Sequence, residues 1–166
     1  MADAISNHYG SLQGVLHSAV EFSAYTPIAA HKTRDWGHTL NVNLNAVFLL
    51  TRVLLPVLNQ SEYASIVFTS DSAVRLPRAY SGAYGVSKIA LEGFAGILAE
   101  ELESAGKIRV NTLVPGPVDC PLRKKAYPAE DKSTLPDMES LQPVYRYLFS
   151  ADSIGKTGQV IDVREF

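Results

Sequence analysis

The sequence has little cysteine and little net charge, and both absences narrow the class of protein. Its 166 residues include one cysteine, Cys120, so no disulfide can form within the chain, which is typical of a reducing compartment such as the cytoplasm. Fifteen Lys and Arg residues against 17 Asp and Glu residues give a net charge of -2. Because nucleic-acid binding selects for a strongly basic surface, we expect no nucleic-acid partner.

Long apolar runs and metal-ligand clusters are lacking as well. The most apolar segment, residues 42–58, is interrupted by Asn43, Asn45 and Arg52 and falls short of the roughly 18 uninterrupted apolar residues that span a membrane. The amino terminus lacks the basic region and apolar stretch of a secretory signal. No i, i+4 pair or cluster of metal-ligand spacing occurs among the histidines His8, His17, His31 and His38. We therefore expect a cytoplasmic protein with no membrane contact and no metal site.

What the sequence does contain is an alternation of strand-like and helix-like segments. An apolar share of 46% fits one domain with a substantial core. Short apolar runs predict strands at residues 14–20, 64–69, 108–114 and 158–163. Apolar residues at helical spacing predict helices at 33–58, with Pro56 as a stop signal, at 82–103 and at 138–149. In the helix at 82–103, we expect Ile89 to face inward and Glu92 outward.

This alternation predicts an α/β fold, in which a parallel sheet is flanked by helices. Ligands of such sheets bind at the carboxyl ends of the strands. Those ends are expected at His17-Ser18-Ala19, Ser70-Asp71-Ser72 and Pro115-Gly116. Six of the nine prolines lie between Pro115 and Pro143, which predicts a long loop whose residues 117–137 shape the substrate pocket.

Tyr84 and Lys88 lie one helical turn apart at the start of the helix predicted at 82–103. Proton transfer near pH 7 requires the pKa of a tyrosine, near 10, to fall by about 3 units, or about 4 kcal/mol. A positive charge about 4 Å away supplies roughly that much at an effective dielectric constant near 20. The pair therefore indicates a proton-transfer site in which Lys88 lowers the pKa of Tyr84. Taken alone, it is also compatible with an exposed first helical turn.

The surrounding motifs resemble those of the short-chain dehydrogenase/reductase family. The Tyr-x-x-x-Lys pair follows a serine-bearing strand end and precedes Arg109-Val-Asn-Thr-Leu-Val-Pro-Gly116. A helical Val42-Asn43 and a late Thr157-Gly158 strand also match, so the resemblance runs from about Leu12 to Val163. It implies that residues 1–166 form a single partial domain, the carboxyl-terminal part of a Rossmann-like doubly wound fold that holds the family's strands four to seven.

The resemblance also implies an NAD(P)-dependent oxidoreductase that moves a hydride between an alcohol and a carbonyl in a small-molecule substrate. Tyr84 would exchange the substrate proton, and Lys88 would lower the pKa of Tyr84 and hold the nicotinamide ribose. Asn43 would anchor a water molecule for proton relay, or else simply bond to its own helical turn. Pro115 and Val118 would line the nicotinamide of NAD or NADP.

Two parts of the family's cofactor site differ here. No glycine-rich dinucleotide loop is present, nor the residue that reads the adenosine ribose, so the family's strands one to three have no counterpart and the strand at 14–20 is left with an open edge. The family's Asn-Asn-Ala-Gly segment reads His17-Ser18-Ala19-Val20, in which only Ala19 matches.

A third difference is at the family's substrate-polarising serine, thirteen residues before the tyrosine, where this chain has Asp71. An ionised carboxylate cannot donate a hydrogen bond, and its charge is expected to raise the pKa of Tyr84. Strand alternation places Ser70 and Ser72 on the opposite face. Either the chain bends after Thr69 and Ser72 supplies the donor, or the donor is lost.

Three hypotheses follow. The first is a short-chain oxidoreductase whose given chain lacks the amino-terminal dinucleotide-binding half, with doubtful catalysis by this chain itself. The second is a non-catalytic remnant or a dimerising interaction module of the same fold. The third is complementation by a separate chain that supplies strands one to three. The family commonly pairs subunits through the helices that correspond to 33–58 and 82–103, which implies a homodimer or homotetramer. The sequence leaves open the substrate and the choice between NAD and NADP.

Overall fold

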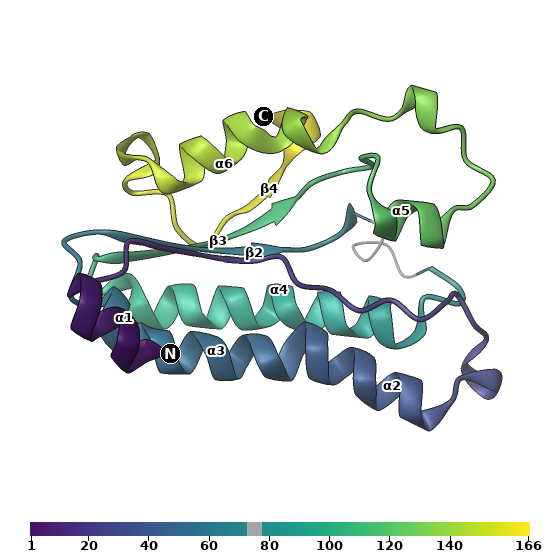
Figure 1. Ribbon diagram of the computed structural model, residues 1–166, viewed down its shortest axis with the longest axis horizontal. Coiled ribbons are helices and arrows are strands. Elements are labelled where there is room, and N and C mark those ends of the chain that lie inside the picture. The colour runs from purple at the N-terminus through teal and green to yellow at the C-terminus, as the bar shows by residue number, and fades with distance from the viewer. Residues whose placement is uncertain (73–77) are drawn as a thin grey trace.

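The computed structural model describes residues 1–72 and 78–166, whose strands form one parallel sheet (Figure 1). The sheet has the order β1-β2-β3-β4, and every neighbouring pair is parallel. Its strands are β1 (Gly14–His17), β2 (Ala64–Thr69), β3 (Ile108–Val114) and β4 (Val160–Asp162). The predicted α/β class with a parallel sheet is confirmed, and β1 is an edge strand.

The two outer strands are shorter than the sequence predicts. β1 ends at His17 rather than residue 20, and β4 spans three residues rather than six. A side chain replaces the sheet as the partner of the chain beyond β1, because Asn43 accepts a hydrogen bond from the Glu21 backbone N–H and donates one to the Glu21 carbonyl. The segment therefore leaves the sheet toward the helices.

The lower face of the sheet is covered by a long helical pair (Figure 1). The predicted helix at 33–58 consists of α2 (Thr33–Leu40), a π-helical segment (Asn41–Asn45) and α3 (Ala46–Leu58). Pro56 lies inside α3, which ends two residues later. The predicted helix at 82–103 is α4 (Gly82–Glu103). The π-helical segment was not predicted, and such segments are frequent at functional sites.

The main hydrophobic core lies between these helices and the sheet. Its fully buried centre includes Leu58 of α3, Ile66 and Phe68 of β2 and Leu91 of α4. The predicted orientation of α4 is wrong at two positions, the first of which is Ile89, whose side chain is 51% exposed. Glu92, which was expected to face outward, instead accepts a hydrogen bond from Ser70 at the end of β2, at 2.5 Å.

The upper face of the sheet carries a smaller core under α6 (Gln142–Phe149) (Figure 1). Val67 and Leu113 of the sheet pack there against Val144 and Leu148. α6 is preceded by a 3₁₀ turn, Met138–Leu141, and the two together fill the helix predicted at 138–149.

Two short helices were not predicted. α1 (Ala2–Tyr9) packs Ala2 and Ile5 against the main core. α5 (Pro121–Ala126) lies within the predicted loop at 117–137, and its first turn is capped by Cys120, whose Sγ accepts a hydrogen bond from the Arg123 N–H. A helix of six or eight residues has too few turns to give a readable apolar period.

The polar motif residues of β3 connect the sheet to α6 and β4. Arg109 is buried and donates to the carbonyls of Leu148 and Ser150. Asn111 donates to the Lys156 carbonyl and accepts from the Gln159 N–H. These side chains therefore have a structural role, which is to hold the carboxyl-terminal segment in place.

By length and composition alone, the 26-residue helix Thr33–Leu58 could cross a membrane, with a mean hydropathy of 1.5 over its most apolar window. This is weak evidence, since core helices of globular domains meet the same criterion. Val47, Leu54 and Leu58 on this helix belong to the main core.

Candidate active site

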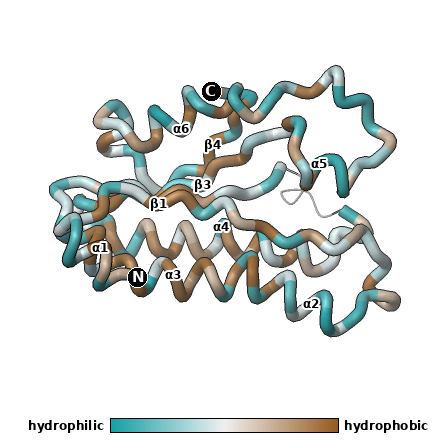
Figure 2. The backbone as a smooth tube through the Cα atoms, in the orientation of Figure 1, coloured by the Kyte–Doolittle hydropathy of each residue, from teal (hydrophilic) through white to brown (hydrophobic). Residues whose placement is uncertain are grey.

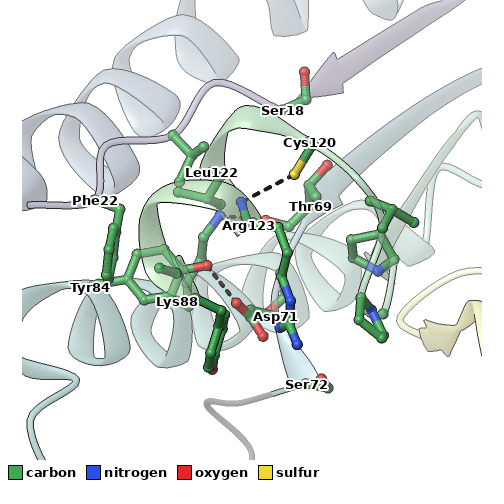
Figure 3. Close-up of a pocket in the computed structure, with 18 of the residues that line it drawn as sticks. Ser18, Phe22, Thr69, Asp71, Ser72, Tyr84, Lys88, Cys120, Leu122 and Arg123 are labelled. Carbon is green, nitrogen blue, oxygen red and sulfur yellow. Dashed lines mark hydrogen bonds between the residues drawn. The ribbon is translucent and has the colours of Figure 1, made fainter. Parts of the chain in front are cut away.

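A cavity of about 110 Å³ opens at the carboxyl ends of β1, β2 and β3 (Figure 3). Five of the predicted site residues line it: Ser72, Tyr84, Lys88, Pro115 and Val118. Asn43 and Ala19 are not among the lining residues, and Ala19 is exposed. The expected convergence of strand ends therefore brings most, but not all, of the predicted residues together.

Tyr84 points at Asp71, which lies two residues after the end of β2. The Tyr84 hydroxyl donates to Asp71 Oδ2 at 2.6 Å, the contact drawn as a dashed line in Figure 3. Burial raises the pKa of the Tyr84 hydroxyl above its usual value, and the charge of Asp71 and the hydrogen bond to it raise the pKa further. The predicted effect of Asp71 is confirmed. The expectation that Lys88 gives Tyr84 a low pKa is wrong for this structure, because the net shift is upward.

Lys88 is one helical turn from Tyr84 and only 3% exposed. Its Nζ donates to the Thr69 carbonyl at the end of β2, at 2.7 Å. Burial lowers the pKa of Lys88 to about 8, against an opposing effect of the Asp71 charge. An ammonium with three N–H donors is thus held at the strand ends with a reduced preference for its charged form.

Asn43 lies in the π-helical segment and is 1% exposed. Besides bonding both backbone groups of Glu21, its Nδ2 donates to Ser87 Oγ at 2.9 Å. Ser87 in turn donates to the Tyr84 carbonyl at 2.8 Å. Asn43 therefore connects the segment after β1 to the helix that carries Tyr84. Its side chain bonds to other segments rather than to its own helical turn.

The two serines beside Asp71 both line the cavity but differ in their contacts. Ser70 donates to Glu92, as described above, so its hydroxyl is directed at α4. Figure 3 shows Ser72 beyond Asp71 on the side away from Tyr84. The carboxylate of Asp71, rather than either hydroxyl, is the group that contacts Tyr84.

An aromatic cluster that sequence reasoning missed closes the cavity. Phe22 makes edge-to-face contacts with Tyr25 and Tyr84, with ring centroids 5.0 and 5.3 Å apart. The hydroxyls of Tyr25 and Tyr127 lie 3.0 Å apart across 102 residues of sequence. Burial and this contact raise the pKa of Tyr25 above its usual value. Only the aromatic residues soon after β1 could have hinted at this cluster.

α5 is fastened over the cavity by its basic residues. Arg123 donates to both carboxylate oxygens of Glu130, at 2.5 and 2.6 Å, and its guanidinium lies 3.9 Å from the ring centroid of Tyr127. Lys125 donates to the Phe22 carbonyl. The Arg123 contacts brace the predicted substrate loop internally, and the Lys125 contact joins it to the segment that follows β1.

Comparison with known proteins identifies the family. A family model described as short chain dehydrogenase matches residues 1–131. The chain belongs to the short-chain dehydrogenase family. Oxidoreductase YciK of Escherichia coli (strain K12) is 38% identical over 164 residues, and the match covers 99% of this chain but 64% of YciK.

Solved structures of short-chain dehydrogenases have the same fold. One from Salmonella enterica serovar Typhi CT18 has a TM-score of 0.95 and 40% identity, with 98% of this chain and 67% of that chain covered. One from Escherichia coli CFT073, in complex with NADPH, has a TM-score of 0.94 and 39% identity, with the same coverage. The Rossmann-like architecture is therefore confirmed, and the chain spans about two thirds of the length of these relatives.

The cavity residues of this member of the short-chain dehydrogenase family fit the nicotinamide-ribose end of a dinucleotide. Lys88 has three N–H donors, of which Thr69 takes one, and ribose hydroxyls are suitable acceptors. Pro115 and Val118 give apolar walls suited to a flat ring. Among the described residues, no group of three His, Cys, Asp or Glu side chains could hold a metal ion.

Proposed function

We propose that this chain carries the catalytic part of an NAD(P)-dependent oxidoreductase that interconverts an alcohol and a carbonyl in a small-molecule substrate. The observation that carries the proposal is the meeting of Tyr84 and Lys88 with Pro115 and Val118 in one cavity at the strand ends. The NADPH bound in the Escherichia coli CFT073 structure supports a nicotinamide cofactor. We also propose that the loop at 117–137 forms the substrate side of the cavity.

In this proposal, the nicotinamide group supplies the hydride chemistry. Lys88 binds the ribose hydroxyls and orients that end of the cofactor. Tyr84 contacts the substrate oxygen, and the Asp71 carboxylate holds its hydroxyl in place. Asn43 holds the segment after β1 against the helix that carries Tyr84. It would also anchor a water molecule for proton relay.

Cofactor binding tests the proposal directly. NADPH and NADH are titrated separately into the purified chain, and binding is followed by the fluorescence of the reduced nicotinamide. We expect dissociation constants below the millimolar range for at least one of them. Dissociation constants in the millimolar range or above for both nucleotides would contradict the proposal that this chain itself carries out cofactor-dependent catalysis.

A pair of lysine variants assigns the binding to the cavity. Lys88→Met removes the buried ammonium and is expected to weaken binding about tenfold, which corresponds to the loss of a charged hydrogen bond. Lys107→Met, at an exposed lysine outside the cavity, is the matched control and should leave the affinity unchanged. Equal effects of the two substitutions would show that the nucleotide binds elsewhere.

We further propose that two copies of the chain pair through α3 and α4. Both helices expose large apolar side chains, including Leu49 and Val53 on α3 and Ile89 and Ile97 on α4, each more than half exposed. Figure 2 shows hydrophobic stretches along both helices. Sedimentation should detect a dimer or tetramer that Ile89→Glu dissociates, whereas Ile154→Glu at another exposed apolar side chain should not. A wild-type monomer would rule the pairing out.

The alternative, a non-catalytic interaction module, is not favoured by the family comparison. It predicts pairing without nucleotide binding, so the two experiments above separate it from the oxidoreductase. The cytoplasmic location stays a prediction from the sequence.

A further inference from the structure

We propose that a row of aromatic side chains makes the cavity selective for a substrate whose alcohol or carbonyl group is attached to an aromatic ring. The row consists of Phe22, Tyr25 and Tyr127, and Phe22 joins it to the candidate catalytic residue Tyr84. The inference rests on the proposed function for the identity of the cavity as the substrate site. It goes further by assigning the class of substrate, which the sequence leaves open.

The first step is the continuity of the rings. The ring centroids of Tyr84 and Phe22 are 5.3 Å apart, and their planes meet at 86°. Those of Phe22 and Tyr25 are 5.0 Å apart, and those of Tyr25 and Tyr127 are 5.8 Å apart, again in edge-to-face contact. All four side chains line the cavity. A ligand that reaches the Tyr84 hydroxyl therefore lies in a cavity with aromatic rings in its wall.

The second step is that the folded chain fixes the rings in place. Phe22 and Tyr25 follow β1, Tyr84 lies on α4, and Tyr127 directly follows α5. The hydroxyls of Tyr25 and Tyr127 are hydrogen-bonded to each other, and Lys125 donates to the Phe22 carbonyl. The rings are thus held in position by contacts within the chain, so a ligand gains their contacts without first having to order them.

The third step is the preference for an aromatic partner. Aromatic rings favour edge-to-face or offset contacts with each other, and one such contact corresponds to about a twofold to tenfold gain in affinity beyond the effect of the area buried. Tyr25 and Tyr127 are only half-buried and both line the cavity, so a ligand ring can contact them. The Arg123 guanidinium covers one face of Tyr127 and leaves its other side for contact. A flat ring extends the row, whereas a saturated ring gains only the burial of its surface.

The remaining described walls suit a ligand with a single ring. Leu122 and Ala126 of α5 add apolar surface beside the aromatic row. The cavity volume of about 110 Å³ is of the same order as the roughly 150 Å³ of an engineered apolar cavity that binds benzene. Pro115 and Val118, which are proposed above to line the nicotinamide, do not belong to the row. The substrate ring and the nicotinamide ring thus have walls of their own.

The inference is tested with benzyl alcohol and cyclohexylmethanol, which carry the same alcohol group on an aromatic and on a saturated six-membered ring. Binding of each probe to the purified chain is measured by saturation-transfer NMR at pH 7. Wild type should bind benzyl alcohol about threefold or more tightly than cyclohexylmethanol. Burial of apolar surface alone gives the opposite order, since the saturated ring has the larger apolar surface. Equal affinities, a preference for the saturated ring, or no binding of either probe would overturn the inference.

Leucine substitutions show whether the rings cause the preference. Phe22→Leu and Tyr127→Leu keep an apolar side chain but remove the ring, so the ratio of the two affinities should fall to near unity or invert. Tyr9→Leu, at an exposed tyrosine on α1 outside this cavity, should retain the wild-type ratio. Circular dichroism checks the folding of each variant, and the half-buried Tyr127 provides the test if the buried Phe22 cannot be replaced. An unchanged ratio in the folded variants contradicts the inference.

Titration with NADPH separates the substrate side of the cavity from the cofactor side. Phe22→Leu and Tyr127→Leu should leave the NADPH affinity unchanged, because their rings contact the substrate. If they weaken NADPH binding as much as Lys88→Met does, the row lies against the nicotinamide and the inference is wrong. Aromatic preference without nucleotide binding keeps the assignment of the rings and removes the oxidoreductase proposal. Nucleotide binding without aromatic preference does the reverse.

Discussion

The two halves of α4 face the same sheet, but the first half buries polar side chains and the second half buries apolar ones. The first two turns bury the polar side chains of Tyr84, Ser87 and Lys88, whereas the later turns bury Leu91 and Leu98 in the main core. The apolar half stabilises the fold by removing hydrocarbon from water. The polar half buries an ammonium whose pKa is lowered by that burial. The carboxyl-terminal part of α4 thus stabilises the fold, whereas its amino-terminal part buries a charged group at the expense of stability.

The largest effect should come from the apolar half. Leu98 is 4% exposed, and Leu98→Ala should lower the free energy of unfolding by about 3 kcal/mol through lost burial and a residual cavity. The neighbouring Ile97 is 61% exposed, so Ile97→Ala should change it by less than about 0.5 kcal/mol. Denaturant unfolding measures both, and equal losses would contradict the assignment of the core face.

Lys88→Met, in the polar half, should raise the free energy of unfolding rather than lower it. The folded-state pKa of Lys88 is about 8 against an ordinary 10.5, so the folded state releases this proton first as the pH rises. The free energy of unfolding is therefore highest above about pH 10.5, where Lys88 is neutral in both states. It falls as the pH drops toward about 8, because the folded state must then bury the charged ammonium. At pH 7, Lys88→Met should therefore raise the free energy of unfolding by about 2 kcal/mol, after allowing for its hydrogen bond to Thr69.

Unfolding at pH 7 and pH 10 checks this prediction. The advantage of Lys88→Met over wild type should shrink at the higher pH, where the wild-type lysine is largely neutral in the folded state. Lys107→Met at an exposed lysine is the control and should show no such pH dependence. A destabilised Lys88→Met protein at pH 7 would mean that the ammonium contributes favourably to the fold.

His17, at the end of β1, is a titratable side chain buried against Phe68 of the main core, and its burial should also lower stability at low pH. It is 7% exposed, stacks on Phe68 with ring centroids 5.0 Å apart and contacts Thr51 Oγ1 through Nε2 at 3.0 Å. Burial lowers the pKa of His17 to about 4 from 6.5. The unfolded state therefore binds more protons between these values, and stability is lost as the pH falls from about 6.5 to 4.

The loss attributable to His17 should be about 2 kcal/mol over that window. Unfolding of wild type and His17→Gln across pH 4 to 7 measures it as the difference between the two pH profiles. His8→Gln, at an exposed histidine on α1, should follow wild type. Parallel profiles for wild type and His17→Gln would show that folding does not shift the pKa of His17.

The smallest effect should come from Ser87, in the polar half of α4. Ser87→Ala removes an acceptor for Asn43 Nδ2 and a donor to the Tyr84 carbonyl, which should lower the free energy of unfolding by about 1 kcal/mol. Thermal unfolding of Ser87→Ala measures this loss. Glu100→Ala, at an exposed position on the same helix, is the control for comparison. A larger loss than that of Leu98→Ala would invert the comparison between the two halves.

The central elements could be read from the sequence because their apolar runs are bounded by clear breaks. β2, β3 and α4 have the predicted limits to the residue. The orientation of α4 could not be read as well, because apolar residues occur on both of its sides and the helical period does not fix which face is buried. Ile89 was therefore expected inside and is exposed.

The site was predictable where strand ends determine it and not where distant segments close over it. Tyr84, Lys88, Pro115 and Val118 share a cavity because parallel strands end at one edge. The contact between Tyr25 and Tyr127 depends on the folding of α5, which no local pattern specified. The Coulomb argument for Lys88 included its charge but not the burial of Tyr84, so it gave the wrong sign for the pKa shift.

The π-helical segment Asn41–Asn45 sets the rotational phase of the helix beyond it. A π turn holds one residue more than an α turn, and one residue corresponds to about 100° of rotation about the axis. If residues 41–45 continued as α-helix instead, the side chains of Val47, Thr51, Leu54 and Leu58 would be rotated by about 100° relative to α2. A single deletion in this segment would instead convert the π turn to an α turn and leave α2 and α3 in nearly their present relative phase.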